Sequence, residues 1–138
     1  MRIGVPKEIK KHEYRVGLTP SAVSKYVADG HELFVETNAG VGTGFTDYDY
    51  VQAGATICNV KDTFDNAEMI IKVKEPQSSE LDKLRKDHTL FTYLHLAADK
   101  NLTQELMSIG LTSIAYETIQ LPNRSHPCLT PMSEIAGR

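Results

Sequence analysis

The sequence has no tryptophan, few aromatic residues and only two cysteines among its 138 residues. Cys58 and Cys128 lie 70 positions apart, outside any CxxC pattern and without a histidine at metal-ligand spacing. Nothing in this pattern predicts a zinc site or another metal centre. We expect both thiols to be reduced, as is usual in the cytoplasm.

Long apolar runs and clusters of basic residues are also missing. No stretch approaches the roughly 18 apolar residues that a membrane span needs. The apolar stretch after Arg2 is interrupted by Gly4 and Pro6, so it is too short for the core of a signal peptide. The net charge is −3 and the lysines and arginines are scattered, which argues against a nucleic-acid surface. We therefore expect a cytoplasmic protein with no membrane or nucleic-acid partner.

The length and composition predict one compact domain. Chains of roughly 100–200 residues usually form a single core. With 41% hydrophobic and 24% charged residues, the composition is that of an ordinary globular protein. We expect residues 1–138 to form a single domain, with no room for a second.

Short apolar runs alternate with helical periodicity and turn signals, which is typical of an α/β domain on a largely parallel sheet. Strands are predicted at 3–5, 33–35, 69–73, 89–93 and 112–115. Helices are predicted from Thr19-Pro20 to Asp29-Gly30, and at 47–53, 60–66 and 102–109. Gly54 and Gly110 supply stop signals for two of these helices.

The loop Gly40-Val41-Gly42-Thr43-Gly44-Phe45 follows a strand and precedes a helix, as in a dinucleotide-binding motif. The GxGxxG fingerprint, however, would need glycine where Phe45 stands, and the next helix begins with acidic Asp47 and Asp49. We interpret the loop as a turn with positive φ at one or more glycines.

The end of the sequence predicts a helix start. Thr130-Pro131-Met132-Ser133-Glu134 offers a capping hydroxyl, a first-turn proline and a first-turn glutamate. The chain stops within about two turns of it, whereas helices average about 11–12 residues. We expect the sequence to be part of a longer protein.

Three residues that can bind or titrate follow predicted strands, where an open α/β sheet places its ligand site. The Arg15 guanidinium suits two-point recognition of a carboxylate, and the Lys74 ammonium suits a ketone oxygen or carboxylate. The His95 imidazole suits proton transfer near neutral pH. When each residue is considered alone, its spacing favours an ordinary role. Arg15 would be a solvated arginine, Lys74 an ordinary lysine like Lys72, and His95 a histidine packed between leucines.

Taken together, several strings resemble one family. They are Ile3-Gly4-Val5-Pro6-Lys7-Glu8-Ile9-Lys10, Arg15-Val16-Gly17-Leu18-Thr19-Pro20, Lys72-Val73-Lys74-Glu75-Pro76, Phe91-Thr92-Tyr93-Leu94-His95-Leu96-Ala97-Ala98 and the stretch from Leu129 to Arg138. In this order they are similar to the amino-terminal region of the alanine dehydrogenase and nicotinamide nucleotide transhydrogenase family. The resemblance covers essentially the whole chain.

The resemblance implies a three-layer α/β domain with an open, mostly parallel sheet, similar to the catalytic domain of formate and glycerate dehydrogenases and flavodoxin-like. It implies NAD-dependent, reversible deamination of L-alanine to pyruvate and ammonia. Arg15 and Lys74 would hold the substrate, with Lys74 and His95 catalytic and Met132 and Ser133 facing the cofactor.

It also implies that the NAD-binding Rossmann domain lies outside this chain and that the parent enzyme is a homohexamer. A returning carboxy-terminal segment completes this domain in the family. We therefore expect exposed apolar surface here, with association or marginal stability, and no activity from the isolated chain.

Two alternatives stay open. One is the corresponding domain of a transhydrogenase alpha subunit, whose equivalents of the two strand-end segments lack the lysine and histidine found at Lys74 and His95. The other is a non-catalytic oligomerisation or regulatory module.

Overall fold

The computed structural model describes residues 1–128 as one six-stranded sheet in the order β3-β2-β1-β4-β5-β6. Every neighbouring pair of strands is parallel. The strands are β1 (Arg2–Val5), β2 (Glu32–Glu36), β3 (Thr56–Cys58), β4 (Met69–Ile71), β5 (Thr89–Thr92) and β6 (Thr112–Ala115). The prediction of an α/β fold on a mostly parallel sheet is confirmed.

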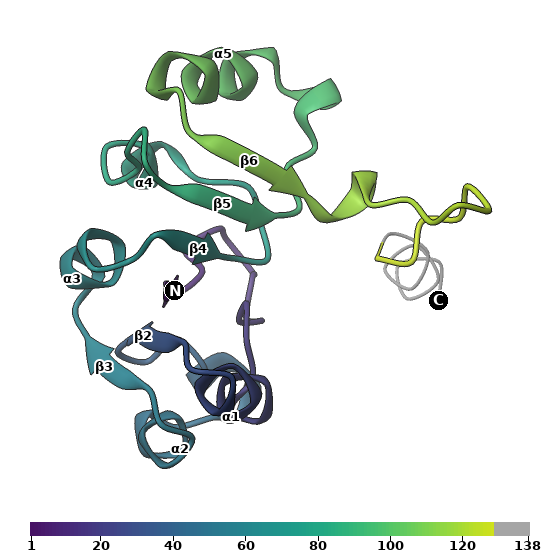
Figure 1. The fold of residues 1–138 in the computed structure, drawn as a ribbon. Coiled ribbons are helices and arrows are strands. Elements are labelled where there is room, and N and C mark those ends of the chain that lie inside the picture. The colour runs from purple at the N-terminus through teal and green to yellow at the C-terminus, as the bar shows by residue number, and fades with distance from the viewer. Residues whose placement is uncertain (129–138) are drawn as a thin grey trace.

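Five helices connect the strands of the described part. They are α1 (Pro20–Ala28), α2 (Asp47–Gln52), α3 (Val60–Asp65), α4 (Ser78–Leu81) and α5 (Lys100–Ile109), with short 3-10 turns at Val41–Thr43, Leu96–Ala98 and Tyr116–Thr118. Figure 1 shows α1 and α2 on one face of the sheet, near β2 and β3, and α3, α4 and α5 on the opposite face. The chain thus winds outward from the central pair β1–β4 in two directions.

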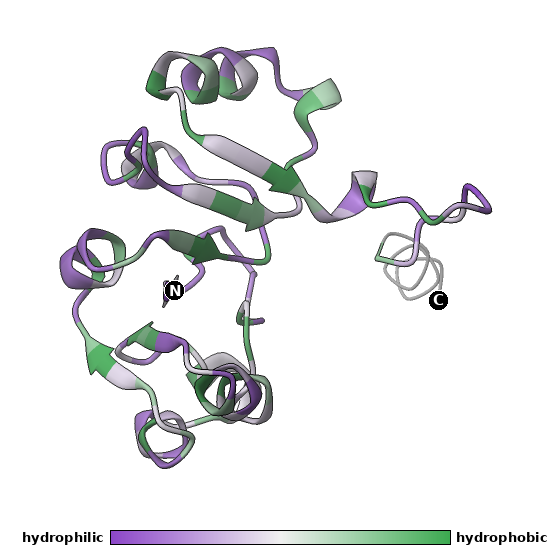
Figure 2. Cartoon of the chain, in the orientation of Figure 1, coloured by the Kyte–Doolittle hydropathy of each residue, from purple (hydrophilic) through white to green (hydrophobic). Residues whose placement is uncertain are grey.

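Two apolar clusters hold the three layers together. On one face, Val23 of α1 and Tyr50 of α2 are completely buried against β1 and β2. On the other face, Phe64 of α3 and Leu102 of α5 pack against β4 and β5. Figure 2 shows hydrophobic residues along β4 and β5 and hydrophilic ones on the outer turns of α2 and α3. Alternate strand residues face the two helical layers, as in a sheet covered on both sides.

The predicted helix ends carry the expected capping interactions. The Thr19 hydroxyl accepts a hydrogen bond from the Ala22 amide at the start of α1. Gly110 adopts the left-handed conformation that ends α5, with φ of 80°. Gly54, with φ of 102°, follows α2 in the same way.

Two elements were not predicted. The strand β3 has only three residues, which are too few for an alternating pattern. It lies at the edge of the sheet and pairs with β2. The single turn α4 lies in a polar stretch whose helical signal is a capping box between Gln77 and Glu80. The predicted helix start at 130–134 lies outside the described residues.

The glycine-rich loop has the positive φ predicted, at Gly44, with φ of 87°. Gly40 is required for a different reason, since a Cβ there would lie 2.7 Å from the Tyr50 ring. The two ends of the loop are also joined, because the Asp47 carboxylate accepts from the Asn38 amide at 2.8 Å and from the Thr37 hydroxyl at 2.6 Å. A carboxylate thus lies beside the loop, where a nucleotide phosphate would be repelled.

Candidate functional site

The candidate site lies at the carboxyl ends of β1, β4 and β5, which are consecutive strands in the sheet. The chain leaves β1 toward β2 on one side and leaves β4 toward β5 on the other, so the strand order reverses between β1 and β4. Open α/β sheets bind ligands in the crevice at such a point. Arg15, Lys74 and His95 each follow one of these three strands.

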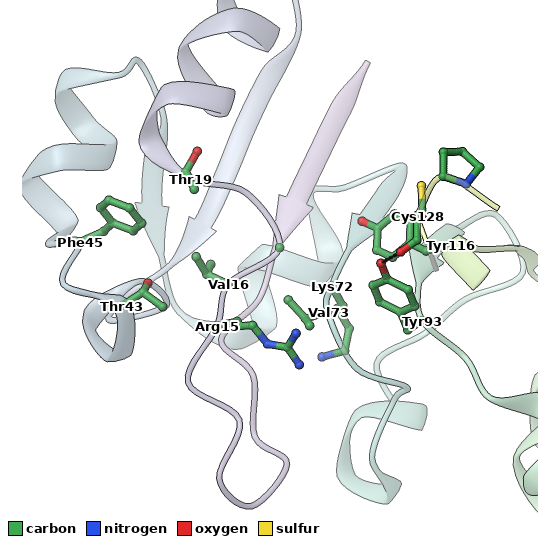
Figure 3. Close-up of a pocket in the computed structure, with 12 residues that line it drawn as sticks. Arg15, Val16, Thr19, Thr43, Phe45, Lys72, Val73, Tyr93, Tyr116 and Cys128 are labelled. Atoms are coloured by element: carbon green, nitrogen blue, oxygen red, sulfur yellow. Dashed lines mark hydrogen bonds between the residues drawn. The ribbon is translucent and has the colours of Figure 1, made fainter. Parts of the chain in front are cut away.

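A cavity of about 530 Å³ opens at this crevice. Figure 3 shows Arg15 and Val16 on one side of it, and Tyr93, Tyr116 and Cys128 on the other. The rest of its lining consists of Gly17, Thr19, Thr43, Phe45, Lys72, Val73 and Pro127. The wall is mostly apolar, and its cationic residues are Arg15 and the buried Lys72, while Lys74 and His95 are not among the lining residues. A mostly apolar wall with a cationic group suits a small organic anion.

Arg15 is held by a carboxylate two residues earlier. Its Nε donates to Glu13 Oε1 at 2.6 Å and its Nη2 donates to Glu13 Oε2 at 2.8 Å, a two-point contact. The hydrogen bond from Arg15 holds the pKa of the Glu13 carboxyl below its usual value. The bond from Glu13 likewise raises the pKa of the guanidinium. Arg15 therefore stays charged with its planar group oriented at the cavity.

Lys74 lies three residues beyond the end of β4, which finishes at Ile71 rather than at the predicted Val73. Its backbone amide donates to Glu8 Oε1 at 3.0 Å, and its carbonyl accepts from the Thr92 hydroxyl at 3.0 Å. The Lys74 charge also contributes to lowering the pKa of Glu13. Lys74 and Arg15 thus both act on the Glu13 carboxylate.

His95 lies in the left-handed region, with φ of 51°, which costs a non-glycine residue about 1–2 kcal/mol. Glu117 compensates by accepting from the His95 amide at 2.8 Å and from the Leu94 amide at 3.0 Å. The exposed His95 side chain lines a separate hollow with Glu117, so the structure does not bring it into the cavity that Arg15 lines. Tyr93, which lines the cavity with Arg15, precedes His95 by two residues after the end of β5.

Tyr93 and Tyr116 form an aromatic wall. Their ring centroids lie 4.7 Å apart, and Tyr116 also meets Phe91 at 4.2 Å. The Tyr93 hydroxyl donates to the Cys128 carbonyl (Figure 3). Burial raises the pKa of both tyrosines, so both are neutral at physiological pH.

Comparison with known proteins identifies the family of this chain. Residues 4–136 match the family model described as "Alanine dehydrogenase/PNT, N-terminal domain". The chain belongs to this family.

The alanine dehydrogenase relatives are similar along the whole of the chain. It is 55% identical to the alanine dehydrogenase of Methanococcus maripaludis and 53% identical to that of Halomonas elongata. These matches cover 100% of the chain but only 37% and 38% of the relatives. The chain thus spans a little over a third of the length of these proteins.

Two solved structures have the same fold. One titled L-alanine dehydrogenase matches all of this chain with a TM-score of 0.96 and 61% identity, over 38% of its own length. The transhydrogenase from Sinorhizobium meliloti matches 90% of the chain with a TM-score of 0.84 and 26% identity, over 36% of its length. The alanine dehydrogenase branch of the family is the more similar of the two.

The sequence did not single out the acidic residues of the site in this alanine dehydrogenase/PNT domain. Glu8 and Glu80 bind Lys72, which is 1% exposed. A signal was present: Lys72 lies in the apolar run Ile70-Ile71-Lys72-Val73, and a buried lysine requires a buried carboxylate. Met132 and Ser133 lie outside the described residues.

Two further findings bear on chemistry. Among residues 1–128, no group of three or more His, Cys, Asp or Glu side chains is arranged to bind a metal ion. No helix in that range is both long enough and apolar enough to cross a membrane.

Proposed function

We propose that this chain is the substrate-binding portion of an NAD-dependent L-alanine dehydrogenase, which interconverts L-alanine, water and NAD⁺ with pyruvate, ammonium, NADH and a proton. The main observation in support is that Arg15, Lys74 and His95 follow three neighbouring parallel strands, around the point where the strand order reverses. The similarity to L-alanine dehydrogenase along the whole chain supports it.

Each side chain has a role that its chemistry suits. The Arg15 guanidinium binds the substrate carboxylate in this proposal. In the structure it binds another carboxylate, that of Glu13. The Lys74 ammonium stabilises negative charge that develops on the keto or carbinolamine oxygen. His95, from the neighbouring hollow, gives and takes the proton on that oxygen. In this proposal the His95 side chain turns toward the cavity when substrate binds.

The described residues do not fit NAD itself. The one glycine-rich loop after a strand within residues 1–128 lacks the fingerprint spacing, and the Asp47 carboxylate is bound to the Asn38 amide just before it. We assign the nucleotide to a Rossmann domain of the longer protein, with Met132 and Ser133 of this chain as contacts. The chain alone is therefore expected to bind a keto acid without turning it over.

The proposal extends to the assembly and its location. The family resemblance supports a homohexamer in the cytoplasm that acts on a small-molecule substrate. The alternative of a transhydrogenase domain has the weaker support, because the solved transhydrogenase is 26% identical against 61% for the L-alanine dehydrogenase.

Titration of pyruvate into the ¹⁵N-labelled chain, followed by amide chemical shifts, tests the proposal. We expect saturable shifts around residues 15–17 and 72–74. In Lys74→Ala the dissociation constant should rise at least about tenfold, because a hydrogen bond to a charged group is worth about 1.5–3 kcal/mol.

Lys25→Ala is the matched control. It removes the same charge from the last turn of α1, at the opposite end of the sheet from the site. Equal pyruvate affinity in Lys74→Ala, Lys25→Ala and the unmodified chain would remove Lys74 from the site. No binding by the unmodified chain would favour a non-catalytic module.

A further inference from the structure

A buried ionic cluster lies directly beneath the candidate site. Lys72 Nζ is 3.1 Å from Glu8 Oε2 and 3.1 Å from Glu80 Oε2, and all three side chains are at most 4% exposed. Glu8 lies in the segment after β1, Lys72 directly follows β4, and Glu80 lies in α4. Two carboxylates and one ammonium leave a net negative charge if all three are ionised. Such a cluster is expensive to bury, so a role beyond stability is worth seeking.

Glu8 does more than pair with Lys72. The same carboxylate accepts from the Val73 amide at 3.2 Å and from the Lys74 amide at 3.0 Å. The β1–β4 ladder ends at the pair Gly4–Ile70, and Pro6 beyond β1 has no amide to continue it. The Glu8 carboxylate thus accepts hydrogen bonds from the Val73 and Lys74 amides, which no longer have a backbone partner in β1.

The backbone of Lys74 is fixed from both neighbours in the sheet. Glu8, from the segment after β1, binds its amide, and the Thr92 hydroxyl, from the end of β5, binds its carbonyl. Two fixed peptide groups set the direction in which the Lys74 side chain leaves the backbone. Glu80 has no such contact: it binds Lys72 and the amide of Gln77.

We propose that Glu8 is a positioning residue for keto-acid binding, which holds the Lys74 backbone so that the ammonium is directed at the substrate oxygen. This inference rests on the proposed function of Lys74. Glu8 itself does not touch the substrate. The negative charge of Glu8 also contributes to raising the pKa of Arg15.

The first test compares Glu8→Gln with Glu80→Gln. Each change removes one carboxylate from Lys72 and keeps the side-chain size, but only the first weakens the contact with the Lys74 amide. We expect both to lower the unfolding midpoint. In Glu8→Gln alone, the Lys74 amide proton should move upfield and the pyruvate dissociation constant should rise about fivefold to tenfold.

A double-mutant cycle with Lys74→Ala separates positioning from general damage. If Glu8 acts through Lys74, then Glu8→Gln should cost nothing further once the lysine is removed. An equal loss of affinity in both backgrounds would overturn the inference, as would equal losses in Glu8→Gln and Glu80→Gln. Loss in Lys74→Ala with none in Glu8→Gln would overturn it while the proposed function stood. No loss in either would overturn both.

A second pair of variants keeps the test valid if a single change unfolds the chain. Lys72→Met with Glu80→Gln removes the buried cation together with one carboxylate, and leaves Glu8 bound to the two amides. Adding Glu8→Gln gives a cluster with no charge at all, and uncharged replacements of buried ion clusters are often tolerated. The two proteins differ only at Glu8. The triple variant should bind pyruvate about fivefold to tenfold more weakly, and equal affinity would contradict the inference.

Discussion

His88 shows how a buried titratable side chain can serve the fold alone. It is 1% exposed, its Nδ1 accepts from the Arg85 amide at 2.9 Å and its Nε2 lies 2.9 Å from the Phe64 carbonyl. This arrangement requires a neutral ring with its proton on Nε2. Burial accordingly lowers the pKa of His88 below its usual value. The residue closes a turn before β5, away from the cavity.

The lowered pKa of His88 predicts a loss of stability in acid. Below about pH 6.5 the unfolded chain binds a proton that the folded chain excludes, so the free energy of unfolding falls as the pH falls toward the folded-state pKa. One proton gives a slope of at most about 1.4 kcal/mol per pH unit.

Urea unfolding of the chain and of His88→Gln, between pH 5 and pH 8, measures this effect. The variant should be less stable at pH 8 and should lack this part of the pH dependence. His12→Gln, at an exposed histidine, should keep it. Parallel pH profiles for the chain and His88→Gln would contradict the assignment.

At the scale of the elements, the contact between β1 and α3 depends on Gly4. A Cβ at this position would lie 2.6 Å from the Thr63 carbonyl and 2.9 Å from the Ala67 Cβ. The Thr63 carbonyl belongs to α3, which packs on β1 and β2, so it cannot move without shifting that helix. The glycine therefore allows the helix to approach the strand closely.

Gly4→Ala is expected to destabilise the chain by about 3 kcal/mol, the upper end of the usual range for overpacking. Gly30→Ala is the control: no atom lies within 4 Å of a Cβ there, and only the positive φ of 92° opposes the change, for about 1 kcal/mol. Chemical denaturation of both variants gives the comparison. Equal losses would show that α3 accommodates the methyl group.

The elements also show how far the sequence predicts this fold. Helices with caps and stop glycines, such as α1 and α5, were placed within one or two residues. The edge strand β3 was missed because three residues carry no period. The end of β4 was placed two residues late, because the apolar run continues through Val73 while the ladder to β1 stops and Glu8 takes over.

For the candidate site, the sequence could indicate residues that follow strands but not the contacts that support them. Arg15, Lys74 and His95 are visible as strand-end residues, and their roles stay a prediction. Glu8 lies 64 positions from Lys72, and only the pairing of β1 with β4 reveals that the two meet. Contacts of this kind depend on topology, which no local pattern encodes.

At the scale of the whole molecule, one half of one sheet face has no helix over it among the described residues. Phe91 of β5 and Ile114 of β6 are register partners, so both face the side that α1 and α2 cover near β1 and β2. Figure 1 shows no described helix on this side of β5 and β6. Ile114 is accordingly 40% exposed, on an edge strand.

This exposed apolar face predicts self-association, since such surfaces favour contact with another apolar surface. In size-exclusion chromatography with light scattering, the mean mass should rise with protein concentration. Ile114→Lys should shift the population toward the monomer, because charge on an edge strand opposes pairing.

Met107→Lys is the control for that experiment. Met107 is 75% exposed on α5, which covers the opposite face. It should associate as the unmodified chain does. A constant monomer mass at all concentrations would contradict the prediction.

The central place of β1 has a consequence for synthesis. The earliest in sequence of the six described strands lies at the centre of the sheet, and its Ile3 cannot meet Met69 until more than sixty further residues have been translated. Until then the nascent chain can form only the β1–β2–β3 half, with one flank of its middle strand unpaired. The full set of contacts around β1 therefore forms only after residue 69 has been made.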